Sequence, residues 1–329
     1  MTTFNGAHTI NQSVRSILRQ SMRNFELIVV DDASSDATPA LLDAINDPRL
    51  IIIRNDERLG IAAARNRGLA KCQARYIAML DHDDLSDCRR LDLQAAYLDE
   101  HPDVVLVGTR VWELDHHKTT PEDQPAQSSP ALLRLLLYLD NPLAWSSVML
   151  RADALCSLAP PMLRPEFEPA DDFDLYHRLL ALGDVARLDI PLTVYHWHAS
   201  NASRRVESRV LDSAAQVLAH AYAPWFGTEA GTAAALVVRH SSNRAAVTDA
   251  ATMTRLREIV RRVAVGLADG RPSEQRAIAA GVRLVLWRLT RAAVRSGRIS
   301  LFRPPAPVLD AAASLTIGAI RAVMRRHSA

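Results

Sequence analysis

The amino-acid sequence predicts an α/β fold in which a mostly parallel sheet carries helices on both faces. Short apolar runs that suit buried strands alternate with amphipathic or alanine-rich stretches that suit helices. The stretches between them are only a few residues long, which is typical of strand–helix–strand units with right-handed crossovers. Two of the apolar runs end in carboxylates, and the carboxyl ends of strands in such a sheet form the ligand crevice.

The first half of the chain supplies most of this alternation. Apolar side chains at 10, 14, 17 and 18 predict a helix over about 9–20. Strands are expected at 25–30, 50–53, 76–80 and 104–107, with helices opening at Thr38-Pro39, after Gly60 and after Asp84. Thr38 is the predicted N-cap of its helix.

The later elements are less regular. A short helix is expected over 132–139, a strand over 145–150, and strands over 185–190 and 192–198 on either side of Pro191. A further helix should open at Asp171-Asp172, because acidic side chains interact favourably with the positive end of the helix dipole.

The composition changes near residues 205–225, which predicts two regions: an α/β domain over 1–210 and an Ala/Arg-rich helical region over 211–329. Residues 251–329 contain 15 arginines, no lysine and four acids, a net charge of +11. Such helices either turn their charges to water or contact an anionic membrane peripherally. The tail lacks the interleaved aromatic residues of a nucleic-acid-binding segment, so no nucleic acid is expected.

The whole chain of 329 residues has a net charge of +2 and three cysteines without CxxC spacing. These features predict reduced thiols and a cytoplasmic protein. No apolar stretch approaches the ~20 residues of a membrane span, so the expected location is cytoplasmic, at most peripheral at the inner membrane face.

The stretch Tyr76-Ile-Ala-Met-Leu-Asp-His-Asp-Asp84 is the strongest functional signal, because a buried strand runs directly into three carboxylates. Hard oxygen ligands at a strand end suit Mn²⁺ or Mg²⁺, and such a cation suits a phosphate-bearing substrate. The alternative is a polar turn that caps the next helix through Asp84 or Ser86.

Several motifs, in order and spacing, resemble those of the inverting, nucleotide-sugar-dependent enzymes of glycosyltransferase family 2, which have the GT-A fold. The resemblance covers roughly the first 205 residues and rests on Thr3-Phe4-Asn5-Gly6, Val29-Val-Asp-Asp-Ala-Ser-Ser-Asp36, Gly60-Ile-Ala-Ala-Ala-Arg-Asn-Arg-Gly68, Leu80-Asp-His-Asp-Asp84, Asp171-Asp-Phe-Asp-Leu175 and 195–203. It implies transfer of a sugar from a nucleotide-diphosphate donor to a hydroxyl of a glycan, polysaccharide or lipid-linked acceptor.

The resemblance also implies residue roles on the donor side. Asp83 is similar to the metal ligand, and Asp81 to a residue near the ribose or the metal. Asp32 and Arg65 are similar to groups that contact the nucleotide. Their alternatives are a helix cap for Asp32 and a solvated helix charge for Arg65. Thr3 and Phe4 belong to the expected donor pocket.

On the acceptor side, direct displacement at the sugar C1 needs a base for the attacking hydroxyl, and a partly desolvated carboxylate serves. Asp172 is similar to the second acid of the family's Glu-Asp pair, and Asp171 stands where the family commonly has Glu. Acids that only complement the helix dipole are the alternative. His198 resembles a histidine that reaches the metal or the diphosphate, and His196 could do the same.

The sequence departs from the family at its start, where the first apolar strand is apparently missing because Met1 falls near that strand's end. This keeps open an impaired or non-catalytic GT-A-like binding protein. A nucleotidyltransferase is less favoured, because residues 4–6 offer no glycine-rich, lysine-bearing phosphate loop.

Overall fold

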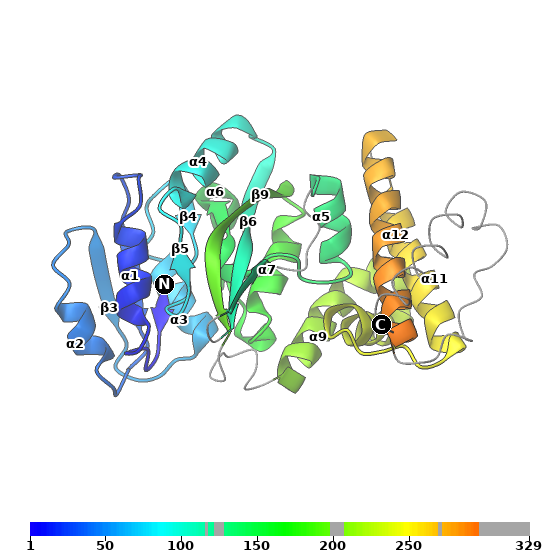
Figure 1. Ribbon diagram of the computed structural model, residues 1–329, viewed down its shortest axis with the longest axis horizontal. Helices are drawn as coiled ribbons and strands as arrows, with labels where there is room; N and C mark the ends of the chain where they lie inside the picture. Colours follow the sequence, from blue (N-terminus) through cyan, green and yellow to red (C-terminus); the bar gives the residue numbers. More distant parts are fainter. Residues whose placement is uncertain (116–117, 122–127, 198–206, 269–271, 296–329) are drawn as a thin grey trace, which may run out of the picture.

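The computed structural model describes residues 1–115, 118–121, 128–197, 207–268 and 272–295 (Figure 1). Two sheets with their helices occupy one side of the molecule in Figure 1, and the carboxyl-terminal helices occupy the other. The acidic segments singled out from the sequence lie in the sheet-containing half.

The first sheet is parallel throughout, in the order β1 (Thr2–Thr3), β2 (Leu27–Asp31), β3 (Leu50–Arg54). Because side chains alternate along a strand, β2 buries residues on both faces. Val29 packs in one cluster with residues of α1 (Ile10–Leu18) and α2 (Thr38–Asp43), and Val30 packs in another with Ala64 of α3 (Ile61–Leu69). The predicted helices on both faces of a parallel sheet are therefore present here.

The first strand, expected to be missing, is present as the two-residue β1. It pairs with β2 in parallel, and the backbone nitrogen of Asp32 donates to the oxygen of Thr3 at 2.9 Å. β1 is not bonded to β4, so the sheet divides at this point. A cavity of about 710 Å³, lined among others by Ile28, Gly68 and Ile77, lies beside the division.

The second sheet is mixed rather than mostly parallel. Its order is β4 (Tyr76–Ala78), β8 (Met149–Arg151), β6 (Val104–Asp115), β9 (Asp184–Trp197), β5 (Leu85–Ser86), with β7 (Lys118–Pro121) paired to β6. Only β6 and β9 run parallel, while the other pairs are antiparallel. Hydrophobic periodicity marks a strand without fixing its direction, which is why the mixed pairing was not predicted.

Three local predictions also differ from the structure. The strand expected over 145–150 is a 3₁₀ turn, Trp145–Ser147, followed by β8. The two strands expected around Pro191 form the single strand β9, whose register against β6 shifts near that proline. α2 begins at Thr38 itself, and the Thr38 N–H is capped by the Asp36 side chain at 2.9 Å.

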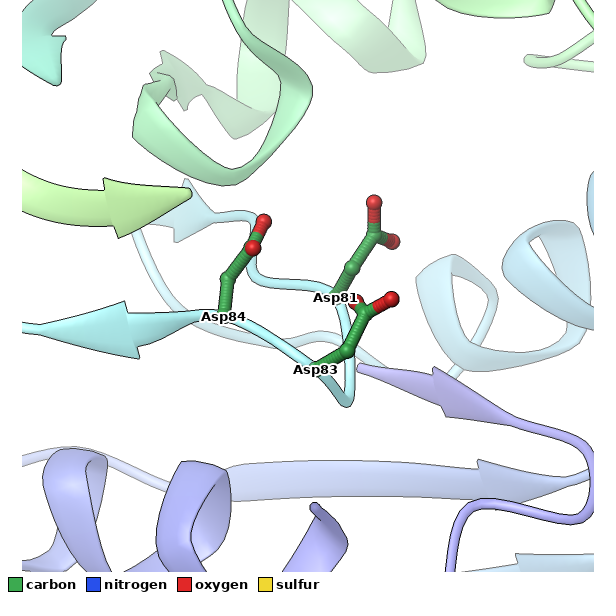
Figure 2. Close-up of side chains that lie close together, drawn as sticks. All are labelled: Asp81, Asp83 and Asp84. Carbon is green, nitrogen blue, oxygen red and sulfur yellow. The ribbon is translucent and has the colours of Figure 1, made fainter. Parts of the chain in front are cut away.

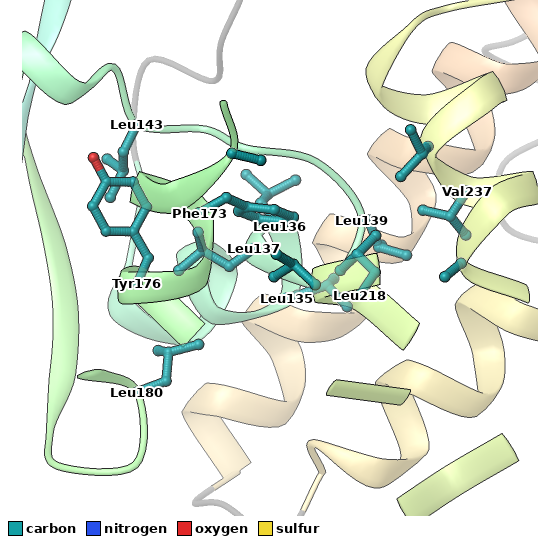
Figure 3. Close-up of a cluster of buried hydrophobic side chains, with 14 of the residues drawn as sticks. Leu135, Leu136, Leu137, Leu139, Leu143, Phe173, Tyr176, Leu180, Leu218 and Val237 are labelled. Carbon is teal, nitrogen blue, oxygen red and sulfur yellow. The ribbon is translucent and has the colours of Figure 1, made fainter. Parts of the chain in front are cut away.

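The remaining helices flank the second sheet and extend beyond it: α4 (Arg90–Glu100), α5 (Pro130–Leu137), α6 (Ala152–Cys156), α7 (Asp171–Leu179), α9 (Glu207–Phe226), α10 (Ala230–Val237), α11 (Ala250–Gly266) and α12 (Pro272–Arg295). One hydrophobic cluster joins both halves, with Leu135, Phe173, Leu218 and Val237 among its members (Figure 3). The helices after residue 206 thus share a core with the sheet-containing half.

Two simpler predictions can also be checked. All three cysteines are free thiols. In the described part of the chain, we find no helix with both the length and the apolar character that a membrane crossing requires.

Candidate active site

The acidic turn Asp81–Asp84 follows β4, and it brings three carboxylates together (Figure 2). One oxygen from each of Asp81, Asp83 and Asp84 lies within 4.8 Å of the others, which is close enough for one cation to contact all three. Asp84 Oδ1 accepts from the backbone nitrogen of His196 at 2.9 Å, while its buried Oδ2 has no hydrogen-bond partner among the described residues. A buried carboxylate oxygen without such a partner is compatible with a bound cation, which would satisfy it.

The electrostatics of the turn agree with this interpretation. Burial, followed by the charges of Asp83 and Asp81, raises the pKa of Asp84 well above its usual range. Without a cation, the cluster must therefore hold a proton or tolerate strong repulsion. The donor set consists of hard oxygens, which fits Mn²⁺ or Mg²⁺.

The turn is held from several sides. The Ser146 side chain accepts from the Asp81 N–H at 2.9 Å, and Ser13 Oγ donates to the His82 carbonyl at 2.7 Å. The buried Arg90 donates to the Met79 carbonyl at 2.7 Å. Gly6 permits the close approach of the His82 ring, because a Cβ at this glycine would lie 2.4 Å from the ring.

Arg65 connects this turn to the acids of α7. Its Nη2 lies 3.0 Å from Asp81 Oδ1, and its Nη1 lies 3.1 Å from Asp171 Oδ2. The guanidinium also lies over the Trp145 ring, 4.4 Å from its centroid. Its side chain is only 12% exposed, so Arg65 is not a solvated surface charge, which was the alternative considered from the sequence.

Asp171 and Asp172 lie in the first turn of α7, as the sequence predicted. Asp171 is buried, whereas Asp172 remains partly accessible. Burial raises the pKa of Asp172 to about 7, with Asp171 adding to the rise and Arg65 opposing it. A carboxyl group with this pKa can accept a proton near neutral pH, which suits a general base.

Asp32, at the end of β2, fixes a loop in this structure. Its two oxygens accept from Asn55 Nδ2 at 2.6 Å and from the backbone nitrogens of Leu59 and Gly60 at 2.9 and 3.0 Å. It does not cap α2, which was its alternative role. Gly60, with φ of 95°, directly precedes α3, so Asp32 positions the helix that carries Arg65.

The loop before α7 also contacts α3. Glu168 accepts from the Ala62 N–H at 3.0 Å, at the first turn of α3. Asn66 forms two hydrogen bonds with the backbone of Leu163, of 2.6 and 2.9 Å. The motif Arg65-Asn66 thus ties α3 to the acidic pair of α7 and to the loop that precedes it.

Thr3 ends β1, and Phe4 begins the turn after it, which is hydrogen-bonded to residues 33–36. The backbone nitrogen of Asn5 donates to Ser34 Oγ at 2.9 Å. Thr3 is buried and its hydroxyl has no partner among the described residues, while the Arg58 guanidinium lies 3.9 Å from the centroid of the Phe4 ring. A free hydroxyl and a ring within this turn are compatible with the predicted donor pocket.

Of the two histidines expected near the metal, His196 and His198, the structure describes only His196. His196 reaches the acidic turn, because its Nδ1 lies within hydrogen-bond distance of the Asp83 carbonyl and its backbone nitrogen holds Asp84. His198, predicted to reach the metal, lies outside the described residues.

Sequence reasoning assigned no individual role to three residues at this site. Asp84 belongs to the three-carboxylate stretch from which the sequence predicts a cation site, but only Asp81 and Asp83 were expected to hold the metal. Glu168 and Asn141, which approaches Asp172, lie in loops whose sequences carry no motif. Their contacts depend on residues 106 and 31 positions away.

The α/β fold, the acidic turn and the acid pair of α7 agree with the class of proteins that the sequence resembles, the nucleotide-sugar transferases of the GT-A type. Residues 1–155 match the model of glycosyl transferase family 2. Residues 1–155 of the chain belong to this family.

Two relatives show how far the likeness extends. EpsE of Bacillus subtilis (strain 168) is 32% identical over 187 residues, 56% of this chain and 66% of that protein. WfaP of Escherichia coli, named as a UDP-Glc:α-D-GlcNAc-diphosphoundecaprenol β-1,3-glucosyltransferase, is 29% identical over 204 residues, 62% of this chain and 78% of that protein. The chain therefore spans just under two thirds of EpsE.

Among solved structures, S. aureus TarS 1-349 in complex with UDP-GlcNAc is similar in fold. Its TM-score is 0.53 at 16% identity, and the match covers 91% of this chain and 87% of that one. This likeness shows that the GT-A-type fold and the following helices have a counterpart in a solved protein.

Proposed function

We propose that the protein is an inverting glycosyltransferase that moves a sugar from a nucleotide-diphosphate sugar to a hydroxyl group of its acceptor. The observation that carries this proposal is the arrangement around Arg65, which joins the carboxylates after β4 to the acid pair of α7. One group of acids suits a cation, and the other contains a carboxyl group of raised pKa.

Asp172 is the proposed base. Its pKa near 7 allows it to be ionised when the acceptor hydroxyl arrives and to take that hydroxyl's proton during attack at C1. Asp171 holds Arg65 beside it. Attack from the face opposite the leaving group inverts the anomeric configuration.

Asp81, Asp83 and Asp84 are the proposed holders of Mn²⁺ or Mg²⁺, which as a Lewis acid would offset the charge that develops on a nucleotide diphosphate. Asp32, Thr3 and Phe4 lie in the neighbouring loops and are the proposed contacts of the nucleoside. Since Asp32 already accepts three hydrogen bonds, it would act on the nucleotide chiefly through the loop at Gly60.

The proposed acceptor class is a glycan or a lipid-linked sugar, in keeping with the name of WfaP. A peripheral membrane contact through the carboxyl-terminal helices is proposed with it. On α12, Trp287 is 45% exposed, and the Arg291 guanidinium lies 5.1 Å from its ring centroid. An exposed aromatic ring beside a cation suits a lipid headgroup region.

The decisive experiment measures sugar transfer with a panel of UDP-, GDP- and dTDP-sugars and Mn²⁺, using diphosphate-lipid and free-glycan acceptors. Asp172→Asn and Asp83→Ala should each lower turnover at least about 100-fold, as removal of a base or of charge stabilisation does. Asp153→Asn, an exposed acid on α6, is the control and should leave turnover unchanged. Full turnover in both site variants would refute the roles assigned to Asp172 and Asp83. Absence of transfer by the wild type with every donor and acceptor would favour a binding protein.

Two further measurements address the finer parts of the proposal. The anomeric configuration of the product, followed by NMR, must be opposite to that of the donor. Flotation of the full chain with anionic and with neutral vesicles tests the membrane contact, which requires selective binding to the anionic vesicles.

A further inference from the structure

The turn after α5 contacts the second acid of the pair, whereas Arg65 contacts the first. Asn141 Nδ2 lies 3.4 Å from Asp172 Oδ2, so the amide group donates toward the proposed base. Asn141 Oδ1 accepts from the Leu143 N–H at 3.3 Å. Because that backbone donor fixes the oxygen of the amide, the NH₂ group must face Asp172.

The position of Asn141 is fixed by the residue before it. The Asp140 N–H donates to the Leu136 carbonyl at 2.7 Å, and Asp140 Oδ1 accepts from the Asn141 N–H at 2.8 Å. The turn therefore stays close to the end of α5. A further hydrogen bond ties α5 to α7, since His177 Nε2 lies 3.0 Å from the Leu137 carbonyl.

The end of α5 beside Asp140 packs against the carboxyl-terminal helices. The Tyr222 hydroxyl of α9 donates to the Tyr138 carbonyl at 2.5 Å, and Gly281 of α12 lies against Leu132 and Leu135 of α5. Burial raises the pKa of Asp140, while the Asn141 N–H, the cations Arg244 and Arg288 and the Ser242 side chain oppose the rise. Arg288 lies on α12, and Arg244 follows α10 with a positive φ of 53°. A non-glycine residue in this backbone conformation is held there by its surroundings, which is common near functional sites.

We propose that Asn141 is a positioning residue for Asp172, and that the carboxyl-terminal helices hold Asn141 in place through Asp140. This inference rests on the proposed role of Asp172 as base. It makes the helical region after residue 206 part of the machinery of the active site. From the sequence alone, that region is expected either to pack on the α/β domain or to contact a membrane.

The side-chain N–H group of Asn141 determines the direction in which the pKa of Asp172 should change. An N–H that donates to a carboxylate stabilises the ionised form and lowers the pKa. Loss of Asn141 should therefore raise the pKa of Asp172. Among the described residues, the other charged or titratable groups that face Asp172 are Asp171 and Tyr176 on α7, Arg65 on α3 and Asp81 of the acidic turn.

Two variants of Asn141 separate the effect of losing the amide donor from the effect of losing side-chain volume. Asn141→Leu keeps the volume and excludes water, while Asn141→Ala admits water, which by itself would lower the pKa of Asp172. Loss of the amide donor is common to both, so Asn141→Leu should raise the pKa of Asp172 by about half to one unit, and Asn141→Ala should raise it by less. Asn243→Ala, an exposed amide beside Arg244, is the control.

The readout is a ¹³C-carboxyl NMR titration of the full ligand-free chain, with Asp172→Asn assigning the resonance. A rise in Asn141→Leu that exceeds the rise in Asn141→Ala supports the inference, and an unchanged or lower value in Asn141→Leu overturns it. Because this readout needs no substrate, it stands apart from the proposed function. A shifted titration without sugar transfer in the wild type would refute the function and leave the positioning role intact.

Arg288→Gln tests the part played by the helical region. It should raise the pKa of Asp172 in the same direction, by less than the Asn141 variants, and lower the rate constant of transfer about two- to fivefold. Binding of UDP, followed by calorimetry, should stay unchanged. Identical titration and turnover in Arg288→Gln and the wild type would overturn the coupling to the carboxyl-terminal helices.

Discussion

Replacing Arg65 by Met should destabilise the protein strongly and in a pH-dependent way. The guanidinium contacts Asp81 and Asp171 at 3.0 and 3.1 Å and is largely buried, as is Asp171 with 1% of its side chain exposed. Removing one partner of a buried ion pair costs about 3–5 kcal/mol, because the remaining charge stays desolvated. Asp81 is 28% exposed, so solvent lowers the expected cost to about 2–4 kcal/mol.

The pH dependence comes from Asp172. Arg65 opposes the rise in the pKa of Asp172, so its loss moves that pKa further above 7. Well above pH 7 the wild type holds Asp172 ionised with the help of Arg65, and the variant lacks that help. Well below pH 7 Asp172 is protonated in both proteins, and this part of the difference disappears. The loss of stability should therefore be larger at pH 8.5 than at pH 5.5.

The measurement is urea unfolding at both pH values and constant ionic strength, with Arg89→Met as the control. Arg89 is exposed and pairs with Asp87 at 3.0 Å, so its loss should cost less than about 1 kcal/mol. Arg65→Lys should be intermediate, because one ammonium group cannot bridge two acids as a guanidinium does. A loss below about 1 kcal/mol in Arg65→Met, or an equal loss at both pH values, would show that Arg65 does not hold the two acid groups together.

Turnover should fall on the acidic side with a midpoint near pH 7, about tenfold for each further unit, because the base must be ionised; the pH profile of kcat/KM checks this. Asp84→Asn should reduce the rise in melting temperature that Mn²⁺ produces, since it removes one of three carboxylates, while Asp153→Asn should keep the full rise; thermal unfolding at several Mn²⁺ concentrations measures both. Gly281→Val should lower the unfolding free energy by about 1–3 kcal/mol, because a Cβ added at Gly281 would lie 2.6 Å from Leu135 of α5. We expect a single unfolding transition shifted by that amount. Two separate transitions would contradict a core shared by α5 and α12.

The sequence predicted the strand and the acidic cluster after it well, because one short stretch carried the whole signal. Tyr76–Asp84 combines an apolar run with carboxylates, and the structure indeed has a strand followed by a cluster of acids. The helix opened by Asp171 was predicted for the same reason, since its dipole and its acids are local features.

Contacts between distant residues could not be predicted in this way. The partners of Arg65 lie 16 and 106 positions away, and only the folded chain shows that the guanidinium lies between them. Near Trp145 the apolar pattern suggested a strand, yet Ser147 Oγ donates to the Ala144 carbonyl at 2.8 Å and a 3₁₀ turn forms instead. The predicted cap of α2 was also wrong. Thr38 is the first residue of the helix, and the Asp36 side chain accepts a hydrogen bond from its N–H.

The charge balance of the site explains why these separate segments belong together. Among the described residues of the site, Arg65 lies between the acidic turn and the acid pair, and two of the acids have raised pKa values because burial and neighbouring carboxylates disfavour their charge. Such a group of acids repels an anionic nucleotide diphosphate unless positive charge is added. A divalent cation at Asp83 and Asp84 would supply that charge on the donor side and leave Arg65 to control Asp172 on the acceptor side. In the proposed chemistry, Arg65 thus separates the acids that would hold the cation from the acid that would act as base.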